Sequence, residues 1–177
     1  MQHKNIIITG ATDGIGLAAA KSIAKKGYHV SLVGRNSEKG KKALEAIIEY
    51  SGNENLDFFE CDLSLVANVK DLADRIKNKH SKIDVLLNNA GGANKTKQIT
   101  SEGLEKTFAT NQMNYFVLST ELLKILSESN DGRIVNVASN AHIGAEVDYE
   151  NINSEKSFSA WTSYCVSKLM NIMFTYQ

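Results

Sequence analysis

The chain has 177 residues, of which 42% are hydrophobic and 23% are charged. That length and that composition are typical of one water-soluble globular domain with a sizeable apolar core. Twenty basic and twenty acidic residues give a formal net charge of zero, which argues against a nucleic-acid partner and against a polybasic membrane surface.

Short β-branched runs alternate with longer amphipathic stretches along the chain. Strands are expected at Asn5–Thr9, His29–Val33, Leu56–Glu60, Ile83–Leu87 and Arg133–Ala138. Helices are expected at Gly14–Lys26, Ser37–Tyr50, Leu104–Phe108, Met113–Ser127 and Tyr164–Tyr176, and a further helix, capped by Ser64, carries apolar residues from Leu65 to Ile76. Because strands that alternate with helices join through right-handed crossovers, the pattern predicts an α/β fold, a doubly wound parallel sheet with helices on both faces. Ligands of such sheets bind at the carboxyl ends of the strands.

The sequence also bears on the cellular compartment. The longest apolar runs, such as Ile6–Ile8, are far shorter than the roughly 20 residues that cross a bilayer. The first residues lack the hydrophobic stretch of a signal peptide. Two cysteines, Cys61 and Cys165, cannot build a disulfide framework, and they read as packing residues in a reducing compartment. We therefore expect a cytoplasmic protein without a membrane span.

The first expected strand runs into a glycine-rich turn, whose residues are Gly10, Ala11, Thr12, Asp13, Gly14, Ile15 and Gly16. In a dinucleotide site the first glycine allows the tight turn, the second lets a pyrophosphate approach the backbone, and the third lets the helix pack against the sheet. The N–H groups and the dipole of the following helix favour a phosphate. A plain strand-to-helix turn is the alternative, but a strand before and a helix after favour a Rossmann-type dinucleotide site.

The end of the second strand bears on the choice of cofactor. Arg35 and Asn36 follow Gly34, and no acidic residue occurs before Glu38. An arginine at this place accepts the 2′-phosphate of NADP, whereas an acidic residue would bind the ribose 2′-hydroxyl of NAD. We therefore expect NADP(H), with NAD(H) as the alternative, because Arg35 could pair with Glu38 and because Asp13 adds negative charge nearby.

Other polar residues on the same rim are less specific. Asp62 and Leu63 follow the third strand, and Asp62 is expected either to accept the adenine amino group or to cap the next helix. The four histidines show no metal-ligand spacing, so no metal site is expected.

Tyr164 and Lys168 are four residues apart and therefore lie on one face of a helix. A tyrosine with a pKa near 10 is a poor base at neutral pH, but a neighbouring cation stabilises its phenolate and lowers that pKa. Such a pair can exchange a proton with an alcohol or carbonyl oxygen while a nicotinamide exchanges the hydride. The spacing occurs by chance in many helices, but beside a dinucleotide turn it predicts an oxidoreductase.

At these motifs the sequence resembles the short-chain dehydrogenase/reductase family, and the resemblance covers the whole chain. The matching segments are Thr9–Gly16, the run Asn88-Asn89-Ala90-Gly91, Asn111 within Ala109–Asn114, Arg133–Ser139, and Tyr164 with Lys168. The stretch from Asn153 to Asn171 and His142 look most like the retinol dehydrogenase branch.

The resemblance implies a role for each of these residues. Tyr164 would be the general acid/base, and Lys168 would lower its pKa and bind the nicotinamide ribose. Ser139 would polarise the substrate oxygen, and Asn111 would hold a water that connects Lys168 to solvent. Asn89, Ala90 and Gly91 would contact the cofactor. Each residue also has a plain structural reading, such as a helix kink at Asn111.

Two features point to missing parts. Gln177 falls within the last expected helix, and the chain contains no proline where average usage predicts about nine. Because family members continue with further strands and substrate-capping helices, we expect the chain to be a fragment. The connection 140–160, with Tyr149, Phe158 and Trp161, is expected to form one wall of a substrate pocket or a surface loop.

Our leading hypothesis is an NADP(H)-dependent oxidoreductase that interconverts an alcohol with its aldehyde or ketone, a small-molecule substrate for which the retinol dehydrogenase resemblance implies an apolar character. A catalytically silent nucleotide-binding fragment and a sugar-nucleotide epimerase are the alternatives. The resemblance also implies a homodimer or homotetramer that associates through the helices at Met113–Ser127 and Tyr164–Tyr176.

Overall fold

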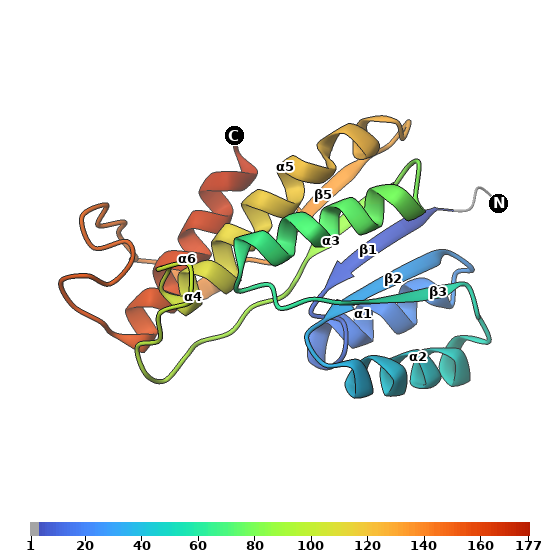
Figure 1. The fold of residues 1–177 in the computed structure, drawn as a ribbon, viewed down its shortest axis with the longest axis horizontal. Coiled ribbons are helices and arrows are strands. Elements are labelled where there is room, and N and C mark those ends of the chain that lie inside the picture. The colour runs from blue at the N-terminus through green and yellow to red at the C-terminus, as the bar shows by residue number, and fades with distance from the viewer. Residues whose placement is uncertain (1–3) are drawn as a thin grey trace.

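The computed structural model describes residues 4–177, which form one parallel sheet between two layers of helices (Figure 1). The strands are β1 (Asn5–Thr9), β2 (His29–Gly34), β3 (Leu56–Glu60), β4 (Val85–Asn88) and β5 (Arg133–Asn136). The helices are α1 (Gly14–Ala24), α2 (Ser37–Ser51), α3 (Val66–Lys79), α4 (Lys106–Phe108), the π-helical turn η1 (Ala109–Met113), α5 (Asn114–Ser127), the 3₁₀ turn η2 (Asn140–His142) and α6 (Ala160–Thr175). The strand order is β3-β2-β1-β4-β5, and all pairings are parallel. The predicted doubly wound α/β fold is confirmed.

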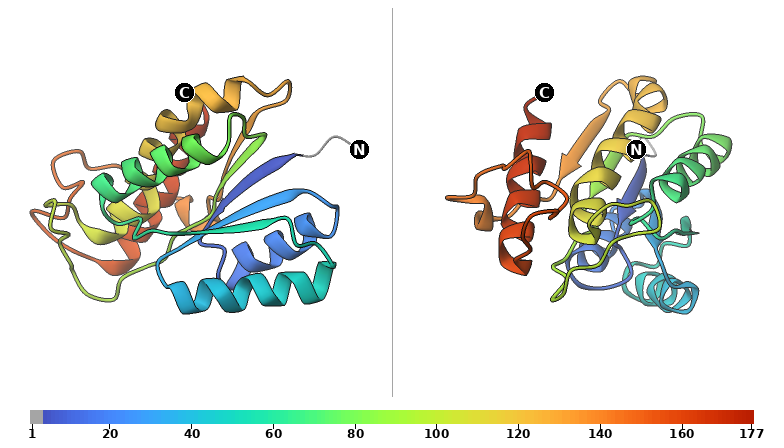
Figure 2. Two further views of the ribbon diagram at one scale, coloured as in Figure 1. Left: turned by 45° about the vertical axis from the view of Figure 1, so that its right-hand side comes forward. Right: turned by 60° about the vertical axis from the view of Figure 1, so that its left-hand side comes forward.

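The continuous apolar run of β1 follows from burial on both faces of the sheet. Ile6 and Ile8 pack with residues of α1 and α2, whereas Ile7 packs with residues of α3 and α5 on the opposite face. Figure 2 shows the two helical layers, with α6 beside β5 at one edge of the sheet. Since β1 lies between β2 and β4, the strand order reverses at its carboxyl end. Folds of this type bind their ligands at that switch point.

Two helix starts differ from the sequence-based expectation. Ser64 does not cap α3: the N-cap is Leu65, and the first N–H groups donate instead to the Glu102 carboxylate, from Val66 at 2.6 Å and from Ala67 at 2.9 Å. The carboxylate that caps this helix comes from a segment 36 residues away, so no local pattern announces it. Helix α6 begins before Tyr164 because the Ser159 side chain accepts a hydrogen bond from the backbone of its first turn.

Helices α4 and α5 form one continuous helical segment, not two separate helices. The turn η1 joins them at Ala109–Met113, and its wider i→i+5 bonding inserts an extra residue at Asn111. Such turns are frequent at functional sites. None of the helices described over residues 4–177 is both long and apolar enough to cross a membrane.

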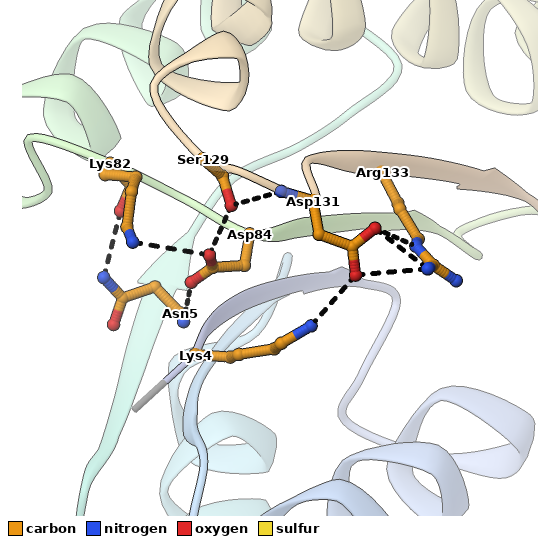
Figure 3. Close-up of polar contacts among 7 residues, drawn as sticks. All are labelled: Lys4, Asn5, Lys82, Asp84, Ser129, Asp131 and Arg133. Atoms are coloured by element: carbon orange, nitrogen blue, oxygen red, sulfur yellow. Dashed lines mark hydrogen bonds and ion pairs between the residues drawn. The ribbon is translucent and has the colours of Figure 1, made fainter. Parts of the chain in front are cut away.

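A polar network lies at the amino ends of β1, β4 and β5 (Figure 3). The carboxylate of Asp84 is buried and accepts hydrogen bonds from the backbone of Asn5 at 2.8 Å and from the Ser129 hydroxyl. Burial raises the pKa of Asp84, but these hydrogen bonds outweigh it and hold that pKa below its ordinary value. Asp131 pairs with Arg133 through two nitrogens of the guanidinium group. This network ties β1, β4 and β5 together at the end of the molecule opposite the candidate site.

Candidate active site

Within the glycine-rich turn, Gly14 is exposed to solvent and Gly16 is buried. Gly14 has a φ of +52°, and a side chain added there would meet nothing within 4 Å. A Cβ at Gly16 would lie 2.3 Å from the carbonyl oxygen of Gly10, so only glycine allows this close approach of α1 to the turn. The open side at Gly14 coincides with the amino end of α1, where free N–H groups and the helix dipole favour an anion.

Two side chains, those of Thr9 and Asn89, hold the glycine-rich turn against the segment that follows β4. Asn89 donates from its side-chain amide to the carbonyl oxygens of Thr9 at 2.9 Å and Gly10 at 3.2 Å. The Thr9 hydroxyl in turn accepts from the backbone N–H groups of Asn89 and Ala90 at 2.9 and 3.0 Å. These bonds join the carboxyl ends of β1 and β4, so the glycine turn and the segment after β4 act as one rigid wall.

A cavity of about 780 Å³ opens at this wall. Except for Tyr164 and Lys168, every residue predicted to bind the cofactor lines this cavity. These residues are Gly10, Thr12, Asp13, Gly14, Ile15, Gly16, Arg35, Asn36, Asp62, Leu63, Asn89, Ala90 and Gly91. The structure thus brings together segments from the ends of four strands. Tyr164 and Lys168 do not line this cavity.

The cavity also contains two cations that the sequence reasoning missed. Lys39 lies in the first turn of α2, four residues after Arg35, and Lys106 begins α4. The spacing of Arg35 and Lys39 was the available signal for the first. No local signal announced Lys106, because α4 reaches the cavity only through the tertiary fold.

The charges around Arg35 differ from the pairing that the sequence suggested. Glu38 pairs with Lys41, with 3.0 Å between Nζ and Oε1, and Arg35 forms no ion pair with any residue in the described range 4–177. Asp13 pairs with Lys39, with 3.4 Å between Oδ2 and Nζ. The alternative in which Glu38 neutralises Arg35 is therefore wrong, and the charge of Asp13 is offset by a neighbouring cation.

Asp62 holds the turn before α3 and also faces the cavity. Its Oδ1 accepts from the backbone N–H of Ser64 at 3.0 Å and from the Ser64 hydroxyl at 2.8 Å. Burial raises the pKa of Asp62, but the hydrogen bonds from Ser64 outweigh it and lower the pKa. Cys61 lies beside it, and burial raises the pKa of that thiol to about 11, which keeps it protonated and unreactive at neutral pH.

Lys168 is a buried ammonium group close to Gly91, which lines the cavity. Only 3% of the residue is exposed, and its Nζ donates to the carbonyl oxygen of Val137 at 2.8 Å. Desolvation lowers the pKa of Lys168 to about 8. Its Nζ lies 5.8 Å from the centroid of the Tyr164 ring and 5.6 Å from that of Tyr115. The buried ammonium therefore lies near two phenol rings.

Tyr115 is a residue that the sequence reasoning missed. It is fully buried in α5, and its hydroxyl has no hydrogen-bond partner among the described residues. Burial, and to a lesser extent the nearby Tyr164, raises the pKa of Tyr115. Tyr164 itself is half-buried and stacks on the exposed Trp161, with 6.1 Å between ring centroids. The tyrosine four residues after Asn111 was the available signal, since that spacing places both on one face of a helix.

Ser139 and Asn111 are each held in place by hydrogen bonds. The Ser139 hydroxyl accepts a hydrogen bond from the backbone N–H of Ala141 at 3.2 Å, at the start of η2. Asn111 bonds both the N–H and the carbonyl of Gly92 at 2.9 Å and donates to the Ser167 hydroxyl at 2.9 Å. The Asn111 side chain therefore positions the segment after β4 against α6. The water that would connect it to Lys168 stays a prediction.

The long connection after β5 forms a second cavity, of about 270 Å³, against α6. Phe158 lines it, but Tyr149 and Trp161 do not, being 71% and 66% exposed. Ser139, Tyr164 and Lys168 also lie outside it. The expectation that the connection 140–160 forms a wall of a substrate pocket stays a prediction, and of the three aromatic residues only Phe158 lines this cavity. His142 lines neither cavity, and its Nδ1 lies 2.7 Å from the carbonyl oxygen of Ser139.

The amino-acid sequence of the whole chain is similar to those of known proteins. The sequence profile of the short chain dehydrogenases matches residues 4–177. Human polyprenol dehydrogenase is 35% identical over 96% of this chain and 53% of its own length. Human retinol dehydrogenase 11 is 36% identical over 97% of this chain and 54% of its own. The chain thus spans about half the length of these curated relatives, and the expected similarity to retinol dehydrogenases is confirmed.

Solved structures show the same fold. A Mycobacterium paratuberculosis protein superimposes with a TM-score of 0.84 at 30% identity, covering 98% of this chain and 60% of that one. A protein of Escherichia coli CFT073, assigned to the short chain dehydrogenases and crystallised with NADPH, gives a TM-score of 0.79 at 28% identity. That match covers 98% of this chain and 69% of the other.

Proposed function

Because the chain belongs to the short-chain dehydrogenase family, we propose that it is an NADP(H)-dependent oxidoreductase that interconverts an alcohol with its aldehyde or ketone. The observation that carries the proposal is the desolvated ammonium of Lys168, which faces the Tyr164 ring beside the glycine-lined cavity. Burying a cation costs free energy, and here the buried ammonium lies against a phenol ring, where its positive charge can stabilise a phenolate. A phenol beside a cation is suited to proton transfer to a carbonyl oxygen.

Each side chain then has a distinct task. In the direction of reduction, Tyr164 donates its proton to the carbonyl oxygen, and the Lys168 ammonium stabilises the phenolate that remains. With a pKa of about 8, Lys168 is about nine-tenths protonated at pH 7. Ser139 uses its oxygen to accept from Ala141, so its hydroxyl hydrogen is free to donate to the same substrate oxygen. When bound, the nicotinamide supplies or accepts the hydride.

The cofactor residues fit a dinucleotide with an extra phosphate. The open backbone at Gly14 and the amino end of α1 suit the pyrophosphate. Arg35 is exposed and unpaired among residues 4–177, and Lys39 lies one helical turn away. Together they offer the 2′-phosphate a charge-assisted contact that NAD cannot use. The crystallised relative from Escherichia coli contains NADPH, which agrees with this choice.

The substrate, the oligomeric state and the compartment follow from other features of the chain. An apolar substrate is favoured by the similarity to retinol and polyprenol dehydrogenases. A homodimer through α5 and α6 is favoured by the exposed apolar side chains of Phe116, Leu123 and Met173 on these helices. A reducing compartment, the cytoplasm, is favoured by the two unpaired cysteines, Cys61 and Cys165.

The decisive experiment measures NADPH and NADH oxidation with a panel of aldehydes and ketones that includes long apolar ones. Tyr164→Phe is expected to lower turnover at least about 100-fold, the range of a lost general acid, while cofactor affinity stays unchanged. Tyr176→Phe is the matched control, because Tyr176 directly follows the last residue of α6 and is 85% exposed. Equal rates for wild type and Tyr164→Phe would overturn the mechanism. Cofactor binding without turnover of any substrate would favour the silent nucleotide-binding alternative.

A further inference from the structure

Two histidines that are 51 positions apart in the sequence meet at the amino end of the sheet, opposite the cofactor cavity. His29 begins β2, His80 ends α3, and Asp57 lies on β3 between them. The His29 Nε2 lies 2.9 Å from Oδ2 of Asp57, and the His80 Nε2 lies 3.6 Å from the same oxygen. One donor atom from each residue lies within 4.8 Å of the others. We propose that His29, Asp57 and His80 form a binding site for a divalent transition-metal ion, with Zn²⁺ the expected occupant.

The separations suit a tetrahedral ion. Zinc binds imidazole nitrogen and carboxylate oxygen at about 2.0–2.2 Å, so two ligands of one tetrahedral ion lie about 3.4 Å apart. The observed 2.9 and 3.6 Å bracket that value, and small rotations of the side chains make the set regular. Three protein ligands leave the fourth position to water, and the Ser31 hydroxyl, 3.4 Å from both Asp57 Oδ2 and His80 Nε2, can hold that water.

The protonation state of the histidines also suits a metal ion. A metal ion binds the neutral form of an imidazole, in which one ring nitrogen carries the proton and the other is the ligand. His29 has no partner for its buried Nδ1 among the described residues. Moving the His29 proton from Nε2 to Nδ1 therefore gives up only the bond to Asp57, which the ion replaces.

The remaining charges limit the affinity without closing the site. The Lys79 ammonium bonds the other carboxylate oxygen of Asp57, Oδ1, and its side chain is half exposed. It opposes a cation but leaves Oδ2 available. The carbonyl end of α3 lies at His80 and contributes partial negative charge that favours a cation. With two nitrogens and one oxygen as donors, the site favours Zn²⁺ over Mg²⁺ and Ca²⁺, which require oxygen ligands.

The test titrates the protein, purified without a histidine tag, with Zn²⁺ alone against a chromophoric chelator, with Mg²⁺ in parallel. One Zn²⁺ per chain is expected, and Zn²⁺ at 100 times its Kd should raise the Tm by about 5–10 °C. His29→Gln and His80→Gln should each weaken Zn²⁺ binding more than about tenfold. His142→Gln, a histidine on a loop, is the matched control and should bind as the wild type does.

A fourth variant keeps all three ligands and guards against loss of folding. Lys79→Met removes the opposing charge, so it should tighten Zn²⁺ binding several-fold. Weaker binding in Lys79→Met would overturn the assignment of Asp57 as a ligand. Equal Zn²⁺ affinity in the wild type, His29→Gln and His80→Gln would overturn the site. None of these readouts depends on enzymatic activity, so the result is independent of the proposed function.

Discussion

Replacing Lys168 by methionine is expected to abolish turnover and yet to stabilise the fold at pH 7. The difference between the ordinary pKa of 10.5 and about 8 corresponds to about 3.4 kcal/mol, at 1.36 kcal/mol per pH unit. Burial of the ammonium costs the folded protein that free energy at neutral pH. Methionine avoids this cost, but it leaves the carbonyl of Val137 without its 2.8 Å hydrogen bond, a loss of about 1–1.5 kcal/mol. The expected net gain at pH 7 is about 2 kcal/mol.

The sign of this effect should reverse with pH. Because the pKa of Lys168 is lower in the folded state, the unfolded chain binds more protons between pH 8 and 10.5, and the stability of the wild type rises through that range relative to the variant. Above pH 10.5 both states carry a neutral lysine, and only the lost hydrogen bond remains. The methionine variant should then be the less stable by about 1 kcal/mol.

Urea unfolding of wild type and Lys168→Met at several pH values between 7 and 10.5 measures this crossover, without cofactor present. Other titrating groups are common to both proteins and cancel in the difference. Lys124→Met, at an exposed lysine of α5, is the matched control and should differ from wild type by a constant, small amount. A stability difference of the same sign and size at pH 7 and pH 10 would refute the idea that Lys168 is a desolvated cation.

Three further predictions concern the cofactor, the sheet and the buried phenol. Changing Arg35 and Lys39 together to serine should reduce the preference for NADPH over NADH about tenfold or more, and an unchanged ratio of Kd values would place the 2′-phosphate elsewhere. Asp84→Asn should lower the free energy of unfolding by about 1–3 kcal/mol at pH 7 through weakened bonds such as that from Ser129. Since the pKa of Asp84 is lowered in the folded state, that deficit should shrink as the pH falls below about 3.9 in a pH series of unfolding midpoints. Tyr115→Phe removes a buried hydroxyl that has no partner among residues 4–177, so its thermal midpoint should equal or exceed that of wild type, and a clear loss would reveal a partner.

Local sequence patterns predicted most of the strands and helices because burial on both faces requires unbroken β-branched runs such as that of β1. The boundaries that were wrong depend on distant residues. Glu102 supplies the cap of α3 from another part of the chain, and the π-helical turn at Asn111 carries no distinctive composition. Both are settled by tertiary contacts, which outweigh local propensity.

The same division runs through the candidate site. The glycine spacing and the Tyr164–Lys168 pair are visible in the sequence because each is confined to one turn or one helix. Other features of the site are not visible in the sequence, because they depend on which segments the fold brings together. They are the contribution of Lys106 to the cavity, the pairing of Asp13 with Lys39 and the position of Tyr115 near Lys168.

By itself, the sequence determined the α/β class and indicated the glycine-rich turn and the Tyr164–Lys168 pair, since periodicity and short spacings encode them directly. Only the tertiary structure decided the desolvation of Lys168 and which distant residues meet. Burial turns Lys168 from an ordinary lysine into one with a pKa of about 8, and strand pairing brings His29 and His80 to one carboxylate. Desolvation and long-range contact arise from the packing of the whole chain, so no local stretch of sequence can specify them.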